Sequence, residues 1–154
     1  MPGQIEKRLA ELGIELPDAP APAATYAPTV QTGKLVFISG QVPIDANGLV
    51  KGKLGAGYSI EQGQAAARLC ALSLIAQMKN AAGGDLDRVK RVVKLLGFVN
   101  CTQDFENHPQ VVNGASDLLV EVFGDKGRHA RSAVGAPALP FQVAVEVEAI
   151  VELE

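Results

Sequence analysis

The sequence contains no tryptophan, only two cysteines and two histidines, and few aromatic residues of any kind. Aromatic residues make up 5% of the 154 residues and hydrophobic residues 47%, so the core must be built from Val, Leu, Ile and Ala. Two cysteines are too few for a disulfide framework or a four-ligand metal site, and the histidines lack metal-ligand spacing. We therefore expect no metal site, and expect Cys70 and Cys101 to be buried, reduced thiols.

The sequence also lacks an excess of positive charge and any long apolar run. It has 14 Lys and Arg residues against 17 Asp and Glu residues, a formal net charge of −3. That balance produces no general field for nucleic acid or an anionic membrane. No stretch approaches the roughly 20 apolar residues of a membrane span, and the N-terminus lacks the apolar region of a signal peptide. We expect a cytoplasmic protein without nucleic-acid or membrane partners.

The chain divides by composition into a short N-terminal part, residues 1–28, and a single domain, residues 29–154. In the first part, Ile5, Leu9 and Leu12 recur at helical spacing and Gly13 follows as a helix stop. Residues 17–28 are rich in Pro and Ala, and each Pro fixes its own φ and favours extended backbone before it. This pattern predicts an N-terminal helix followed by an extended connector.

Residues 29–154 alternate between strand and helix patterns. A capping box of Ser59 and Gln62 begins a long Ala-rich helix that ends at Gly83 and Gly84, and Asn107 can cap a second helix that ends at Gly124. The predicted strands cover residues 35–39, 89–99, 131–139 and 143–153, with a turn at 45–48 before residues 49–50. This order favours an α+β fold, a mixed sheet with two helices on one face and the other face left for water or a partner.

The sequence has no Gly-rich phosphate loop, G-x-S-x-G, H-E-x-x-H or C-x-x-C motif, so no motif indicates a bound nucleotide or a covalent nucleophile. Two residues stand out, Arg131 after a loop and Glu146 on the face of the final strand opposite its valines. The cation and the carboxylate could face each other in a site, or form a structural ion pair across an interface. Asn113 lies on an Ala- and Val-rich helix, and a polar residue in such a helix is more often a hydrogen-bonded structural residue than part of a site.

Three separated segments resemble signature regions of the RidA/YjgF family of reactive-intermediate deaminases. They are residues 35–43 (LVFISGQVP), 130–134 (ARSAV) and 145–150 (VEVEAI). The similarity spans about residues 23–152, and the predicted N-terminal helix resembles a longer branch of the family, often labelled L-PSP endoribonuclease-like. The resemblance implies a chorismate-mutase-like fold, a homotrimer with clefts between subunits, and hydrolysis of 2-imino or enamine acids to 2-oxo acids and ammonia.

The resemblance also implies roles for individual residues. Arg131 matches the arginine that holds the substrate carboxylate, and Glu146 matches the acid that handles water. The backbone at Ala133 would bond the imine nitrogen, and Ala133 itself replaces a common family cysteine, so no thiol is needed at that position. The remaining pocket-lining positions are Ser39, Gly40, Asn113 and Tyr26. A guanidinium can hold a carboxylate by two parallel charged hydrogen bonds, and no metal or organic cofactor is required.

The sequence is also compatible with two other functions. One is a non-catalytic trimer that uses Arg131 to bind small carboxylate metabolites. The other is a ribonuclease, which needs an acid/base pair and a phosphate-binding surface, for which only Lys126, Arg128 and His129 make a local case.

Overall fold

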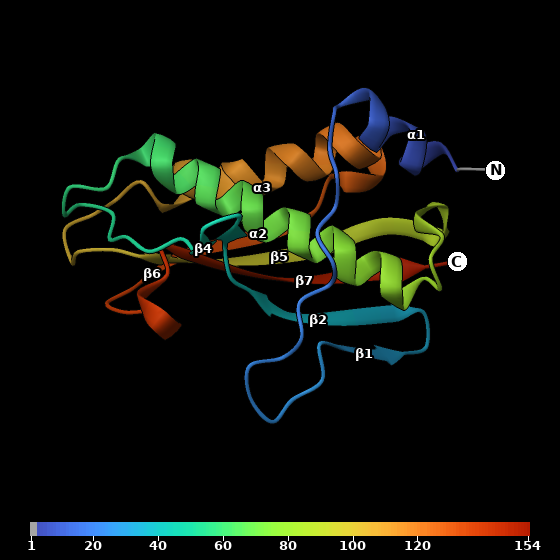
Figure 1. Cartoon of the computed structure of the whole chain (residues 1–154), viewed down its shortest axis with the longest axis horizontal. Helices are drawn as coiled ribbons and strands as arrows, with labels where there is room; N and C mark the ends of the chain where they lie inside the picture. Colours follow the sequence, from blue (N-terminus) through green and yellow to red (C-terminus); the bar gives the residue numbers. More distant parts are fainter. Residues whose placement is uncertain (1–2) are drawn as a thin grey trace.

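A computed structural model describes residues 3–154, which form a mixed sheet covered by helices on one face (Figure 1). The helices are α1, α2 and α3, and three short 3₁₀ helices, η1 to η3, lie between the main elements. The helical segments are α1 (Gln4–Glu11), α2 (Ile60–Ala81), η1 (Leu86–Arg88), α3 (His108–Phe123), η2 (Gly124–Gly127) and η3 (Pro140–Gln142). The strands are β1 (Thr29–Thr32), β2 (Leu35–Gln41), β3 (Ile44–Asp45), β4 (Gly48–Leu49), β5 (Val89–Asn100), β6 (Ala130–Ala136) and β7 (Val145–Leu153).

The main sheet has the strand order β1-β2-β7-β5-β6, and β3 and β4 form a separate small hairpin. Strands β5 and β6 are parallel and the other neighbours in the main sheet are antiparallel. The parallel pair requires a crossover, which α3 supplies. The predicted mixed α+β sheet, with its two long helices on one face, is therefore confirmed.

The two long helices begin differently. At α2 the predicted capping box is present, since the Gln62 amide donates to Ser59 Oγ at 3.1 Å and the Gln62 side chain accepts from the Ser59 amide at 2.8 Å. At α3 the N-cap is Asn107, as predicted, but its side chain makes no capping hydrogen bond. Pro109 in the first turn reduces the need for one, because it carries no N–H group.

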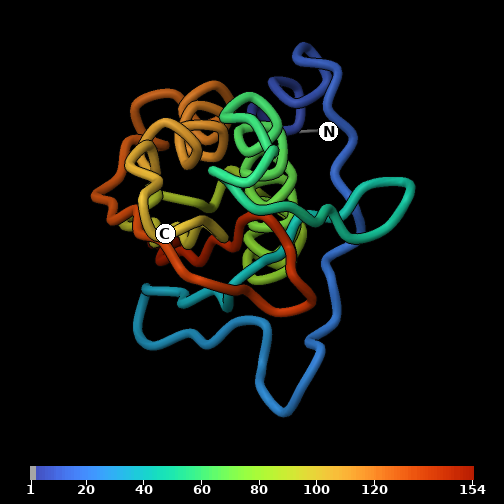
Figure 2. Tube along the Cα trace, turned by 90° about the vertical axis from the view of Figure 1, so that its left-hand side faces the viewer, coloured from blue at the N-terminus to red at the C-terminus, as the bar shows by residue number. Residues whose placement is uncertain are grey.

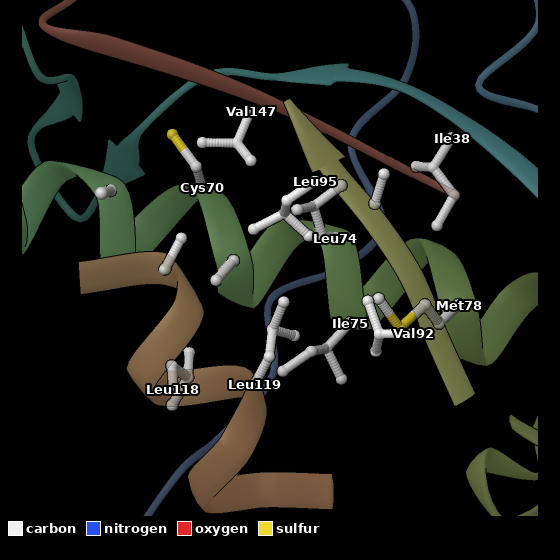
Figure 3. Close-up of a cluster of buried hydrophobic side chains, with 14 of the residues drawn as sticks. Ile38, Cys70, Leu74, Ile75, Met78, Val92, Leu95, Leu118, Leu119 and Val147 are labelled. Carbon is white, nitrogen blue, oxygen red and sulfur yellow. The ribbon is translucent and has the colours of Figure 1, made fainter. Parts of the chain in front are cut away.

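The core lies between the helices and the sheet (Figure 3). Along β7 the residues from Val145 to Leu153 alternate, and every second side chain is buried beneath α2 and α3. Helix α3 can approach α2 closely because Gly114 has no side chain, and an added Cβ would collide with the backbone of Gln64. Cys70 and Cys101 are both buried and free, as predicted.

Helix α1 packs against α3 and η1 on the outer side of the helical layer (Figure 1). The backbone amides of Gln4 and Ile5 each donate to the carboxylate of Asp87 at 2.9 Å, and these bonds hold the pKa of Asp87 below its usual value. Leu9 belongs to the main core cluster. The N-terminal helix is thus fixed to the body by both packing and hydrogen bonds.

The connector that follows α1 runs down the side of the molecule and reaches the edge of the sheet before β1 (Figure 2). Gln77 Nε2 on α2 donates to the Pro20 carbonyl at 2.8 Å. Further along, Ser39 Oγ on β2 donates to the Ala27 carbonyl at 2.8 Å. These bonds tie the connector to a helix at one end and to the sheet at the other.

Within residues 3–154, no helix combines the length and the apolar character needed to cross a membrane.

Candidate functional site

Arg131 lies on β6, an edge strand of the sheet, and its side chain turns toward α3. Its Nη1 donates to Asn113 Oδ1 at 2.8 Å and to Ser116 Oγ at 3.2 Å, and its Nη2 donates to the Pro109 carbonyl at 3.3 Å. A guanidinium has five N–H donors, so these three bonds leave donors for a ligand. Helix α3 therefore holds the cation in place without using all of its hydrogen-bonding capacity.

Ser116 and His129 extend this network on the side of η2. His129 Nδ1 lies 2.6 Å from the Gly127 carbonyl, and His129 Nε2 lies 2.9 Å from Ser116 Oγ. A carbonyl oxygen only accepts, so in the neutral ring Nδ1 carries the proton and Nε2 accepts from the serine hydroxyl. No sequence motif indicates this pair, although Ser116 lies three residues after Asn113 and so shares its helix face.

The environment of His129 favours the neutral ring. Burial is the main cause that lowers its pKa, and the nearby charge of Arg131 lowers it further, against the opposing effect of the bond to Gly127. The ring is thus a proton acceptor at neutral pH.

This lowered pKa predicts a pH-dependent stability. Unfolded His129 binds a proton near its ordinary pKa of 6.5 and folded His129 does so only at lower pH, so unfolding takes up a proton between the two values. The contribution of His129 to the free energy of unfolding should therefore decline as the pH falls from about 7 to 5. The free energy of unfolding, obtained from urea denaturation at several pH values, should fall more steeply with decreasing pH for the wild type than for His129→Gln. Parallel plots of this free energy against pH would contradict the prediction.

Glu146 lies on β7 with its side chain on the face of the sheet away from α2 and α3. Burial raises the pKa of its carboxyl, and the neighbouring charge of Glu148 adds to the rise. The carboxylate lies against Gly40, where an alanine Cβ would come within 2.8 Å of Oε2. A cavity of about 360 Å³ opens beside it, and Tyr26 and Phe141 contribute to its lining.

The connector and the β3–β4 hairpin form much of this cavity, and the two lie near each other in Figure 2. Most of the lining residues are apolar. The lining residues are Pro20, Ala21, Pro22, Ala23, Ala24, Tyr26, Pro28, Gly40, Gln41, Val42, Ile44, Leu49, Pro140, Phe141 and Glu146. The apolar lining accounts for the desolvation of the carboxyl group.

Three of the candidate residues, Ser39, Asn113 and Ala133, line neither the cavity beside Glu146 nor the cleft beside Arg131. Ser39 makes its hydrogen bonds to the connector, where its amide and hydroxyl bond the carbonyls of Pro28 and Ala27. Ser39 therefore positions the segment that carries Tyr26. Ala133 is half-buried on β6 and its side chain packs against the core cluster.

The structure separates the candidate residues into two groups. Arg131 pairs in register with Leu95, whereas Glu146 pairs with Phe98, and the odd spacing of these β5 partners puts the two side chains on opposite faces of the sheet. Arg131 borders a cleft with Ser116 and His129, while Glu146 borders the cavity with Gly40 and Tyr26. Within one chain Arg131 and Glu146 therefore do not face each other, because their side chains project from opposite faces of the sheet.

Among residues 3–154, no three His, Cys, Asp or Glu side chains are close enough to hold a metal ion together.

Fold and sequence together place the chain in a known family. The family model described as "YjgF/chorismate mutase-like, putative endoribonuclease" matches residues 6–153, nearly the whole chain. The chain belongs to the YjgF/RidA family, and its α+β fold is the chorismate-mutase-like fold of that family.

Individual relatives cover the same length. The chain is 54% identical to protein TCP17 of Trypanosoma cruzi over 98% of this chain and 95% of the relative. A solved protein of unknown function from Agrobacterium tumefaciens is 45% identical, with a TM-score of 0.90 over 97% of this chain and 92% of that one. A mouse protein named 2-iminobutanoate/2-iminopropanoate deaminase is 30% identical over 89% of this chain and 87% of its own length. The family therefore includes proteins named as imine deaminases.

Proposed function

We propose that the protein hydrolyses small 2-imino acids and their enamine tautomers to 2-oxo acids and ammonia, in sites shared between the subunits of a homotrimer. The observation that carries the proposal is the separation of Arg131 and Glu146. Each borders a hollow on its own face of the sheet, so Arg131 of one copy and Glu146 of another can complete a site that one chain leaves divided. The deaminase name of the mouse relative supports the choice of reaction.

Arg131 would bind the substrate carboxylate. Its remaining N–H donors can form charged hydrogen bonds with the carboxylate oxygens, and the bonds to Asn113 and Ser116 prevent the guanidinium from rotating away. A fixed carboxylate also fixes the C=N group attached to it, which lowers the entropy cost of the reaction. The backbone amide at Ala133 is our candidate donor to the imine nitrogen.

Glu146 would transfer the protons. Its carboxylate removes a proton from a water molecule as the new C–O bond forms at the carbon of the protonated imine and the C=N electrons move to nitrogen. The carboxyl group then gives that proton to the amino nitrogen, and the C–N bond breaks as the hydroxyl proton passes back to the Glu146 carboxylate, so that ammonia leaves and the hydroxyl becomes the 2-oxo group. A raised pKa suits a group that must both accept and donate a proton near neutral pH.

Assembly into a trimer would also cover the free face of the sheet. Large apolar side chains are exposed along this side of the molecule, among them Leu35, Phe37 and Val134. These residues lie on β2 and β6, away from α2 and α3, where a second copy could bury them. An oligomer would therefore bury apolar surface and complete the site at the same time.

The test is a turnover assay with a 2-imino acid generated in place by an amino acid oxidase. We expect the protein to accelerate release of the 2-oxo acid well above the spontaneous rate. Calorimetry with the 2-oxo acid, measured in parallel, detects binding without turnover. Binding with no acceleration would replace the proposal by a non-catalytic carboxylate-binding trimer.

A further inference from the structure

A second reactive arrangement lies beside Arg131 and does not involve Glu146. Ser116 Oγ lies 2.9 Å from His129 Nε2, and His129 Nδ1 lies 2.6 Å from the Gly127 carbonyl. A nucleophile, a base and a group that orients the base are thus aligned by hydrogen bonds. This order of groups is typical of a serine activated for covalent catalysis.

The direction of each hydrogen bond supports activation. The Gly127 carbonyl fixes the His129 tautomer, so Nε2 is free to take the proton of the Ser116 hydroxyl. Arg131 Nη1 approaches Ser116 Oγ from another side at 3.2 Å and places a positive charge where an alkoxide would develop. Base and cation act together to make the serine oxygen more nucleophilic.

The pair is also accessible. Ser116, His129 and Arg131 border an open cleft of about 270 Å³, which Asp117, Val120 and Arg128 complete. The side chain of Arg128 is 70% exposed at its rim. Arg128 forms an exposed ion pair with Asp125 at 3.5 Å, so the positive charge next to the serine is that of Arg131, and this charge favours a substrate that carries an anionic group.

We propose that Ser116 and His129 form a serine nucleophile and general base that act on small carboxylic esters carrying an anionic group. Ser116 Oγ forms a bond to the ester carbon as its proton passes to His129 Nε2 and the C=O electrons move to oxygen. The C–O bond to the alcohol then breaks, and the departing alkoxide takes the proton from Nε2. Water attacks the acyl-serine by the same transfers and releases the acid and free Ser116. The guanidinium of Arg131 stabilises the negative charge that develops next to Oγ.

The experiment uses a fluorophosphonate probe, in which the serine oxygen attacks phosphorus and displaces fluoride. We expect one phosphonyl group per chain on the native wild type, located on Ser116 by peptide mapping, and no labelling of Ser116 in urea. Ser116→Ala should remove the label, and His129→Gln should slow labelling roughly 10²-fold or more, because the general base is lost. Ser132→Ala is the matched control, since Ser132 is exposed on β6 beside Arg131 but on the other face of the sheet.

Thermal melting of each variant shows whether a loss of labelling comes from the missing side chain or from unfolding of the protein. The proposal is overturned if the native protein acquires no label on Ser116, or if folded His129→Gln is labelled as fast as the wild type. A protein that hydrolyses imino acids but takes no label would therefore contradict only the Ser116 proposal, and the reverse result would contradict only imine hydrolysis.

Discussion

Replacing Arg131 by alanine should lower kcat/KM for a 2-imino acid by roughly 10²- to 10⁴-fold, because two charged hydrogen bonds to the carboxylate are lost. The folded chain should survive. The variant loses three bonds of its own, to Asn113, Ser116 and the Pro109 carbonyl, at about 1–3 kcal/mol in total for a half-buried side chain. Turnover measured alongside thermal melting tests both expectations.

Arg131→Lys distinguishes a carboxylate clamp from a simple positive charge. One ammonium group cannot reproduce the planar fork or reach Asn113, Ser116 and a ligand together, so lysine should restore little activity. Arg8→Ala is a suitable control, because Arg8 lies on α1 and bonds only to Glu11 and the Glu121 carbonyl among the described residues. Full turnover in Arg131→Ala with a large drop in melting temperature would show that the arginine is structural.

The fold could be predicted from the sequence because its signals are local. The alternation along β7 and the capping box at Ser59 each depend on residues within a few positions of one another. Residue preferences did not predict every local feature of the backbone. Asn107 begins α3 without a side-chain cap, and Phe141 has a positive φ of 58° that no residue preference indicates.

The arrangement of the site could not be predicted in the same way. Whether Arg131 and Glu146 share a face depends on the register of β5 with β6 and with β7, which is a property of strand pairing and not of any one segment. The contact between Ser116 and His129 likewise depends on how η2 turns the chain from α3 back toward β6. Ser116 and His129 are 13 positions apart in the sequence, and no spacing rule connects them.

The division of the site between two faces leads to a subunit-mixing experiment with Arg131→Ala and Glu146→Gln. Each variant alone should lose most of its turnover, since every site lacks either the carboxylate clamp or the proton-transfer group. Co-expression with two different tags, followed by purification on both, selects assemblies that contain both chains, which in the proposed function are trimers. If neighbouring subunits contribute Arg131 and Glu146 to one site, random assortment restores about a quarter of the sites before selection, because each residue is intact in half of the chains.

The controls follow from the same geometry. Mixing wild-type chains that carry the two tags sets the full rate, and mixing Arg131→Ala with a second Arg131→Ala chain should restore nothing. If a site used Arg131 and Glu146 of one chain, every site in the mixed trimer would lack one of the two, and the rate would stay at the level of the single variants. Sedimentation of the mixed protein as a monomer would exclude a shared site directly. Recovery of activity in the mixture requires that the guanidinium on one sheet face meets the carboxylate on the opposite face of another copy.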